Sequence, residues 1–355
     1  MKAIRIAGAG VSGLTAAITL ANAGVPVEVY EILPFDKWRS VSKGIQVIRN
    51  YEARQDILYK FKGMGMRFFK PYPVYREVRY SPSLKQIEIF SKDRPIFYCL
   101  SRNPPNSIVS NLFDEAARKN VTFKFESTIE NPDITATGTR VRRISVFAYH
   151  YEKTSCDGSV HIFLDNRHAS QGYLGILPYY NGEMTLGSAS FNRSEDTSTL
   201  KRKLDRFVET NPIVKDFLKG AKRAKIISDY EDYDAPSTAK AENSVLTGEA
   251  AGFMDASRGF GLSYAVESGY LAAKSIIENT SYDELWKGSF GEEISRYYFR
   301  RKQLARLDNM DYEKIIGEMV KRYGPQISVE RYANFKSSSL LYQDKIREDL
   351  GVASE

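Results

Sequence analysis

The first 32 residues place the strongest constraint on the fold. An apolar run at residues 3–7 is typical of a buried parallel strand, and an alanine-rich stretch at 14–23 predicts a helix. The loop between them consists of Gly8, Ala9, Gly10, Val11, Ser12 and Gly13. A second apolar run at 27–30 is followed by Glu31 and Ile32. This order of strand, glycine loop, helix and strand predicts a Rossmann-type nucleotide-binding unit.

Each part of this unit has a physical role in binding a dinucleotide. Gly8 permits the tight turn, Gly10 lets a pyrophosphate approach the backbone, and Gly13 lets the helix pack closely on the strand. The helix N-terminus offers free N–H groups and a partial positive charge to phosphate. Glu31 can accept hydrogen bonds from ribose hydroxyls, and Ile32 beside it is assigned to the same site. The loop alone does not distinguish FAD from NAD.

A second glycine-rich segment lies far along the chain. Residues 245–247, Val-Leu-Thr, predict a buried strand, and Gly248 and Glu249 follow at its carboxyl end. The next helix start consists of Gly259, Phe260, Gly261 and Leu262. We expect this helix to run to residue 278. Open α/β sheets bind ligands at the carboxyl edge, so this segment predicts the other half of a nucleotide site.

The two segments together, GAGVSG and GEAAG with RGFGL five residues later, resemble FAD-dependent oxidoreductases of the aromatic hydroxylase and geranylgeranyl reductase type. The resemblance implies FAD as a non-covalent cofactor. It implies that Glu249, which stands where this group has an aspartate, binds the ribityl chain. It also implies that residues 259–262 line the pyrimidine edge of the flavin.

Two further segments resemble the geranylgeranyl reductase family. GYLGILP at 172–178 is similar to its GYxWxFP segment, so Tyr173, Gly175 and Pro178 are expected to contact substrate. Arg102 precedes a helical stretch at 108–119, as does the family's arginine that approaches the cofactor. The resemblance implies an enzyme of lipid biosynthesis. It would reduce C=C bonds of a prenyl, geranylgeranyl-type lipid through N5 of the reduced flavin.

Other positions leave alternatives open. Thr137 and Gly138 stand where the group usually has Asp-Gly, whose carboxylate is associated with NAD(P)H handling. The electron donor, NAD(P)H or a reduced protein, is therefore left open. So are a flavin monooxygenase or hydroxylase of the same fold, and a flavin-binding protein with little turnover. A catalytic proton donor cannot be chosen without geometry.

We expect an α/β fold with a Rossmann-like FAD-binding domain, an antiparallel-sheet substrate domain and a helical C-terminal cap. The FAD-binding domain is expected to be discontinuous, over residues 1–70, 100–150 and 235–280. The substrate domain would take residues 71–99 and 151–234. Residues 281–355 would form the helical C-terminal region.

The charge balance narrows the classes of partner. The chain has 51 Lys and Arg against 44 Asp and Glu, a net charge of +7 that suits anionic ligands or a lipid surface. Residues 37–102 hold 15 of the basic residues and 5 of the acidic ones, interleaved with aromatics. We interpret this region as a solvated basic face or a site for an anionic lipid head group, and expect no nucleic acid partner.

Cysteine and histidine usage indicates a reducing compartment and no metal. Cys99 and Cys156 cannot make a disulfide framework, which favours a cytoplasmic location. His150, His161 and His168 show no metal-ligand spacing with cysteines or acids. No apolar run approaches the roughly 20 residues of a membrane span, and peripheral contact with a membrane is left open.

Overall fold

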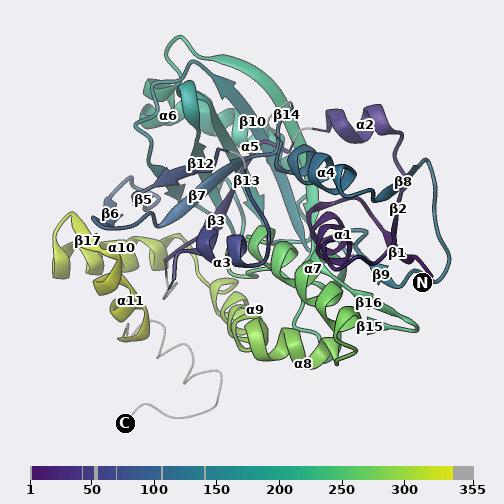
Figure 1. Ribbon diagram of the computed structural model, residues 1–355. Helices are drawn as coiled ribbons and strands as arrows, with labels where there is room; N and C mark the ends of the chain where they lie inside the picture. The colour runs from purple at the N-terminus through teal and green to yellow at the C-terminus, as the bar shows by residue number, and fades with distance from the viewer. Residues whose placement is uncertain are drawn as a thin grey trace.

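The computed structural model describes residues 2–41, 43–51, 55–68, 70–104, 107–139 and 141–338, with side chains described up to 333. One layer is a six-stranded sheet, called sheet A, with the order β15-β16-β9-β1-β2-β8 (Figure 1). Its strands are β1 (Ile4–Ala7), β2 (Val27–Glu31), β8 (Thr122–Phe125), β9 (Ile134–Thr135), β15 (Lys240–Ala241) and β16 (Ser244–Leu246). Every neighbouring pair is parallel except β15 with β16. The expected Rossmann-like sheet is therefore present.

Three helices from distant parts of the chain accompany sheet A, and the first contacts the other two. They are α1 (Val11–Asn22), α4 (Ile108–Arg118) and α7 (Leu262–Ile277). Residues 11–20 of α1 are all buried, which explains the alanine-rich, uniformly apolar sequence. The helix begins at Val11, earlier than the expected residue 14, because the N–H of Leu14 already bonds to the carbonyl of Gly10. The glycine loop is thus the first turn of the helix.

The second layer is an eight-stranded sheet, called sheet C, with the order β14-β10-β13-β12-β11-β5-β6-β17. Its strands are β5 (Arg76–Tyr80), β6 (Gln86–Phe90), β10 (Ile144–Glu152), β11 (Val160–Phe163), β12 (Tyr173–Pro178), β13 (Met184–Ser190), β14 (Lys222–Glu231) and β17 (Gln326–Ser328). The pairs are antiparallel except β5 with β11 and β6 with β17. The expected antiparallel substrate sheet is therefore mixed at one end.

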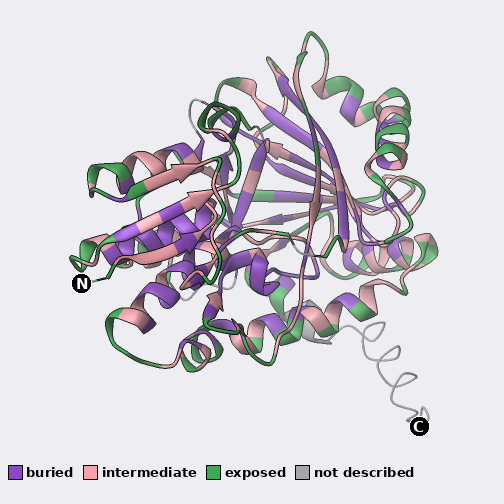
Figure 2. Ribbon diagram, turned by 90° about the vertical axis from the view of Figure 1, so that its right-hand side faces the viewer, coloured by how far each residue is buried: buried purple, intermediate pink, exposed green. Residues whose placement is uncertain are grey.

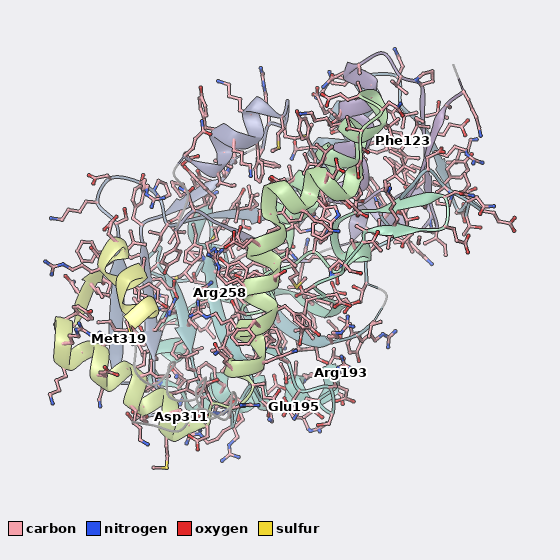
Figure 3. All side chains as sticks on the ribbon, turned by 90° about the horizontal axis from the view of Figure 1, so that it is seen from below. Phe123, Arg193, Glu195, Arg258, Asp311 and Met319 are labelled. Carbon is pink, nitrogen blue, oxygen red and sulfur yellow. The ribbon has the colours of Figure 1, made fainter. Side chains whose placement is uncertain are left out.

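A small antiparallel sheet and the remaining helices complete the fold. The sheet has the order β3-β7-β4, with β3 (Ile45–Arg49), β4 (Tyr72–Val74) and β7 (Phe97–Ser101). The helices are α2 (Phe35–Ser40), α3 (Ile57–Gly63), α5 (Thr197–Thr210), α6 (Pro212–Phe217), α8 (Tyr282–Trp286), α9 (Glu292–Leu304), α10 (Asn309–Tyr323) and α11 (Val329–Ser338). Helices α8 to α11 form most of the C-terminal part, but β17 lies between α10 and α11 and pairs with β6, so the expected helical C-terminal region also contributes a strand to sheet C. Figure 3 shows Met319 of α10 and Phe123 of β8 far apart, at opposite ends of the molecule.

Buried residues lie along the strands of both large sheets (Figure 2). Their side chains form separate clusters on the two sheets. One cluster lies between sheet A and its helices, and another between sheet C and helices α5 and α6. The expected division at residue 150 falls inside β10, which pairs along its length with β13 and β14. Sheet C therefore begins to draw on the chain at residue 144, because a strand bonded on both sides belongs to one sheet. Within the described residues, we find no helix with both the length and the apolar character needed to cross a bilayer.

Helix α7 meets α1 with no side chain between them at Gly269. A Cβ on Gly269 would lie 2.2 Å from the carbonyl oxygen of Ser12. We predict that Gly269→Ala lowers the free energy of unfolding by about 1–3 kcal/mol, because this overpacking outweighs the better helix propensity of alanine. Thermal or denaturant unfolding measures the change. Gly288→Ala is the control, since its added Cβ would meet no described atom within 4 Å. Equal effects of the two substitutions would contradict the close contact.

Candidate functional site

A cavity of about 800 Å³ lies between the carboxyl edge of sheet A and one face of sheet C. The glycine loop and the end of β2 line it on one side. Strands β10, β12, β13 and β14 line it on the other, and β3 and Arg102 add a further wall. The late segment 258–262 closes the space between the two sheets. The fold thus brings both glycine-rich segments to one site.

Most of the predicted cofactor residues line this cavity. They are Gly8, Ala9, Gly10, Val11, Ser12, Glu31, Ile32, Arg102, Glu249, Gly259, Phe260, Gly261 and Leu262. Gly13 and Gly248 lie behind the wall, where they permit close packing. A Cβ on Gly13 would lie 2.1 Å from the carbonyl oxygen of Gly8, and one on Gly248 would lie 2.8 Å from the Ser12 hydroxyl.

Gly8 and Gly10 of the loop differ in how the protein surrounds them. Gly8 has a φ of 102°, and a Cβ there would lie 2.3 Å from the carbonyl oxygen of Ala136. The protein itself therefore requires glycine at this position. A Cβ on Gly10 would meet no described atom within 4 Å, and its φ of −83° suits any residue. The open space over Gly10 faces the cavity, as expected if a ligand approaches the backbone there.

The loop is held on both sides of Ala9. The Glu31 carboxylate accepts a hydrogen bond from the Ala9 N–H at 3.0 Å, and another from the Leu33 N–H at 3.0 Å. The Trp38 indole N–H donates to the Ala9 carbonyl at 3.1 Å. Trp38 was not among the sequence predictions. Nothing in the local sequence shows that α2 places its indole beside the glycine loop.

Unpaired donors occur at two places around the cavity. The first turn of α1 has no side-chain cap, so its N–H groups are open to an anion. The Nε of Arg102 is buried and has no hydrogen-bond partner among the described residues, while its Nη1 donates to Gln46 at 3.2 Å. Burial lowers the pKa of the Arg102 guanidinium, which favours an anionic or polar ligand beside it.

Glu249 is positioned by contacts that the sequence did not reveal. Its carboxylate accepts hydrogen bonds from the Thr139 hydroxyl at 2.5 Å and from the Asp232 N–H at 2.7 Å. Burial raises the pKa of this carboxyl, although the two hydrogen bonds oppose the shift. Thr137 and Gly138 also line the cavity. The segment that replaces the usual Asp-Gly thus supports Glu249 through Thr139.

The start of α7 contains one glycine that the backbone requires and one that packing favours. Gly259 has a φ of 78°. Gly261 has ordinary dihedral angles, and a Cβ there would lie 3.2 Å from the Met254 methyl carbon. Arg258 pairs with Asp255 at 3.3 Å, and its side chain is only 15% exposed. Gly261 therefore faces a side chain of the protein as well as the cavity.

Sheet C presents a floor of small and apolar side chains to the cavity. Gly175, Gly187, Ala148 and Ala189 all line it. Tyr173 lines it too and donates its hydroxyl hydrogen to the Arg258 carbonyl at 2.5 Å. Pro178 does not, because alternation along β12 points it to the opposite face, and Leu177 takes the place in the wall. The space between the floor and segment 258–262 suits an apolar substrate.

The edge strand β14 adds charge to this floor. Ile227, Asp229 and Glu231 alternate toward the cavity. Lys43 pairs with Asp229 at 2.5 Å. Burial and the nearby carboxylates raise the pKa of Glu231 to about 8. Glu231 therefore carries a proton at neutral pH.

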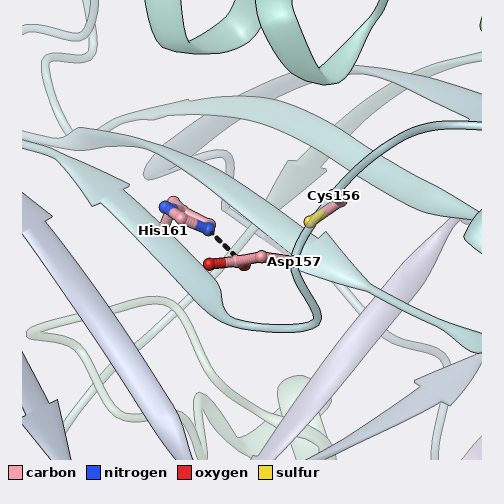
Figure 4. Close-up of side chains that lie close together, drawn as sticks. All are labelled: Cys156, Asp157 and His161. Atoms are coloured by element: carbon pink, nitrogen blue, oxygen red, sulfur yellow. Dashed lines mark hydrogen bonds and ion pairs between the residues drawn. The ribbon is translucent and has the colours of Figure 1, made fainter.

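The histidines lie outside this cavity. Contrary to the spacing argument, His161 meets Cys156 and Asp157, whose ligand atoms lie within 4.8 Å of one another (Figure 4). Asp157 and the Tyr80 hydroxyl occupy the two ring nitrogens of His161 at 2.9 and 3.0 Å. These bonds account for a buried histidine in sheet C without an ion. Burial lowers the pKa of His150 to about 4, so it is neutral at physiological pH.

Solved structures with a similar fold include a flavin-dependent brominase, which matches with a TM-score of 0.58, 13% identity and coverage of 90% of this chain and 99% of that one. A geranylgeranyl bacteriochlorophyll reductase-like protein from Thermoplasma acidophilum matches with a TM-score of 0.76, 18% identity and 98% of each chain covered. The p-nitrophenol 4-monooxygenase of Pseudomonas putida matches with a TM-score of 0.59, 15% identity and coverage of 92% of this chain and 99% of that one. This chain has the fold of the FAD-dependent oxidoreductases. The resemblance to geranylgeranyl reductases is confirmed at the level of the fold.

Sequence comparison adds one relative without an assigned activity. An uncharacterized protein of Methanocaldococcus jannaschii is 30% identical over 178 residues. The match covers 46% of this chain and 43% of that protein, so it spans less than half of either. No protein-family model matches the chain.

Gly10 provides a test of the cofactor site that leaves the fold alone. We predict that Gly10→Ala weakens FAD binding at least tenfold, or about 1.4 kcal/mol, because the methyl group enters space that no described atom occupies. Titration of the FAD-free protein measures the affinity, and thermal unfolding of that protein should be unchanged. The control is Gly63→Ala, whose Cβ also meets no described atom and which lies outside the cavity. Equal affinity for FAD in both variants would exclude the pyrophosphate approach at Gly10.

Glu31 provides a second test. We predict that Glu31→Ala weakens FAD binding about tenfold or more, because it removes a ribose acceptor and releases the Ala9 N–H. Glu31→Gln keeps an oxygen acceptor for the Ala9 N–H and should retain part of the affinity. If Glu31→Ala binds FAD as tightly as the unmodified protein, Glu31 has only a structural role.

Proposed function

We propose that this chain binds FAD in the 800 Å³ cavity and is an oxidoreductase. The observation that carries the proposal is a set of sites where the protein leaves a ligand position open. These are the space over Gly10 and the uncapped N-terminus of α1. Arg102 lines the same cavity, and its buried Nε has no partner among the described residues. The donors at the glycine loop suit a pyrophosphate. Glu249, which also lines the cavity, would bind the ribityl chain. The likeness in fold to a flavin-dependent brominase supports a flavin cofactor.

We further propose that the substrate is a prenyl lipid whose C=C bonds are reduced. The floor of Gly175, Gly187, Ala148 and Ala189 offers an apolar surface with room for a branched chain. Charged side chains gather at its edge on β14, where Asp229 is already paired with Lys43. The likeness in fold to a geranylgeranyl bacteriochlorophyll reductase-like protein supports this substrate class. We place the reaction in the cytoplasm, with the lipid drawn from a membrane surface.

In this proposal, FAD supplies a hydride when it is bound and reduced. The chain's residues bind, orient and exclude water. Ala9 is fixed between Glu31 and Trp38, so the loop that receives the phosphates is rigid before binding. The N–H groups at residues 261–262, at the start of α7, favour negative charge on the ligand beside them. The apolar floor keeps water from the reacting carbons.

The test is an anaerobic single turnover. We predict that the protein with chemically reduced FAD is reoxidised by a geranylgeranyl-type lipid, and that mass spectrometry finds two hydrogen atoms gained for each reduced double bond. The fully saturated lipid of the same length is the control and should leave the flavin reduced.

Two results would contradict the proposal in different ways. A purified chain that binds NAD but not FAD would overturn the cofactor. A reduced flavin that reacts only with oxygen and then hydroxylates an aromatic compound would replace the reductase with a monooxygenase.

A further inference from the structure

Glu231 lines the cavity between the start of α7 and the floor formed by sheet C. It ends β14, and its side chain points to the same face as Asp229 and Ile227, into the cavity. Its Oε2 lies 3.3 Å from the point where a Cβ on Gly259 would stand. Glu231 therefore lies against the α7 start on one side and opens onto the apolar floor on the other.

The other carboxylates of the cavity are already engaged. Asp229 is paired with Lys43 at 2.5 Å. Glu249 accepts from Thr139 and the Asp232 N–H, and Glu31 accepts from two backbone N–H groups. No hydrogen bond to the Glu231 carboxyl is recorded within the part of the chain that the structure describes. Its carboxyl is thus the one of these four that is free to meet a ligand.

The groups around Glu231 favour its neutral form. Burial has the largest effect on its pKa, and Glu249 and Asp229 add negative charge from the late segment and from its own strand. Lys43 and Arg102 oppose them from the walls beside β3 and β7, and the charges of Lys43 and Asp229 largely offset each other because the two side chains are paired. The net effect raises the pKa to about 8. The carboxyl therefore holds a transferable proton over most of the physiological range.

Other proton carriers in this wall are less suited. The Tyr173 hydroxyl already donates to the Arg258 carbonyl, and burial raises its pKa far above neutrality. Arg102 and Arg258 are guanidinium groups, which do not give up protons in proteins. Reduction of an alkene needs one proton for each hydride, so the cavity must supply a donor.

We propose that Glu231 is the catalytic acid that delivers the proton to the substrate double bond. This inference rests on the proposed function. Glu231 gives its proton to one alkene carbon while the other accepts the hydride that reduced FAD supplies, and the π bond breaks. The substrate gains two electrons and two hydrogens, and FAD is left oxidised. The Glu231 carboxylate then regains a proton from water.

The first test is a single turnover with Glu231→Gln. With FAD reduced anaerobically and a geranylgeranyl-type lipid added, we expect flavin reoxidation to slow about 100-fold or more, as for loss of a general acid. FAD affinity should stay within about twofold, because glutamine keeps the shape. Glu209→Gln, an exposed acid on α5, is the matched control and should react at the normal rate. An unchanged rate in Glu231→Gln overturns the proposal.

The second test measures the protonation state of Glu231 without catalytic turnover. The folded pKa of Glu231 is about 8 against an ordinary 4.5, so its stabilising contribution is complete below 4.5 and is lost as pH rises toward 8. Glu231→Gln should therefore gain stability relative to the unmodified protein between about pH 5 and 8, with a plateau above. Thermal unfolding of both proteins across this range measures the difference. A difference that does not change with pH would show that Glu231 is ionised and cannot be the acid.

The two tests separate the two claims. If the unmodified protein does not react with any prenyl lipid, the proposed function fails whatever the unfolding curves show. If it reacts and Glu231→Gln reacts equally fast, or if the unfolding difference is flat, the function stands and Glu231 is not the donor.

Discussion

The site depends on backbone contacts that leave no room for a side chain. A Cβ on Gly8 would lie 2.3 Å from the Ala136 carbonyl oxygen, and one on Gly13 would lie 2.1 Å from the carbonyl oxygen of Gly8. On the other side of α1, a Cβ on Gly269 would lie 2.2 Å from the carbonyl oxygen of Ser12. These contacts fix the first turn of α1 between β9 and α7, and that turn carries the open N–H groups. The end of the cavity with the open N–H groups therefore depends on sheet A and α7 packing directly against the backbone of the first turn of α1, with no side chain between them.

Local pattern was sufficient to predict the strand, glycine loop and helix that form this side of the cavity. The strand, the glycine loop, the helix and the acid at the end of β2 follow one another within 31 residues, and each has a local physical signature. Trp38, Thr139 and Glu231 have no such signature. Their roles come from contacts with residues far away in sequence, such as Ala9, Glu249 and Gly259. A single sequence does not show which distant residue a polar side chain will meet.

Two differences from the sequence prediction come from strand geometry. Alternation along β12 places Leu177 in the cavity wall and turns Pro178 to the other face, although the motif resemblance had assigned Pro178 to substrate. The expected domain border at residue 150 falls inside β10, because both neighbours of that strand belong to sheet C. In both cases the hydrogen-bonded register decides, and a motif comparison carries no information on register.

The same alternation explains how sheet C can enclose a cavity and still be stable. Along β12, Leu174 and Ile176 point into the cluster under α5, while Gly175 between them points to the cavity. Along β13, Leu186 packs in that cluster and Gly187 opens onto the cavity. The large side chains on one face supply the apolar burial that holds the sheet on its helices. The cavity face therefore contributes little to the packing of the sheet. The size of its side chains can instead match the shape of the ligand.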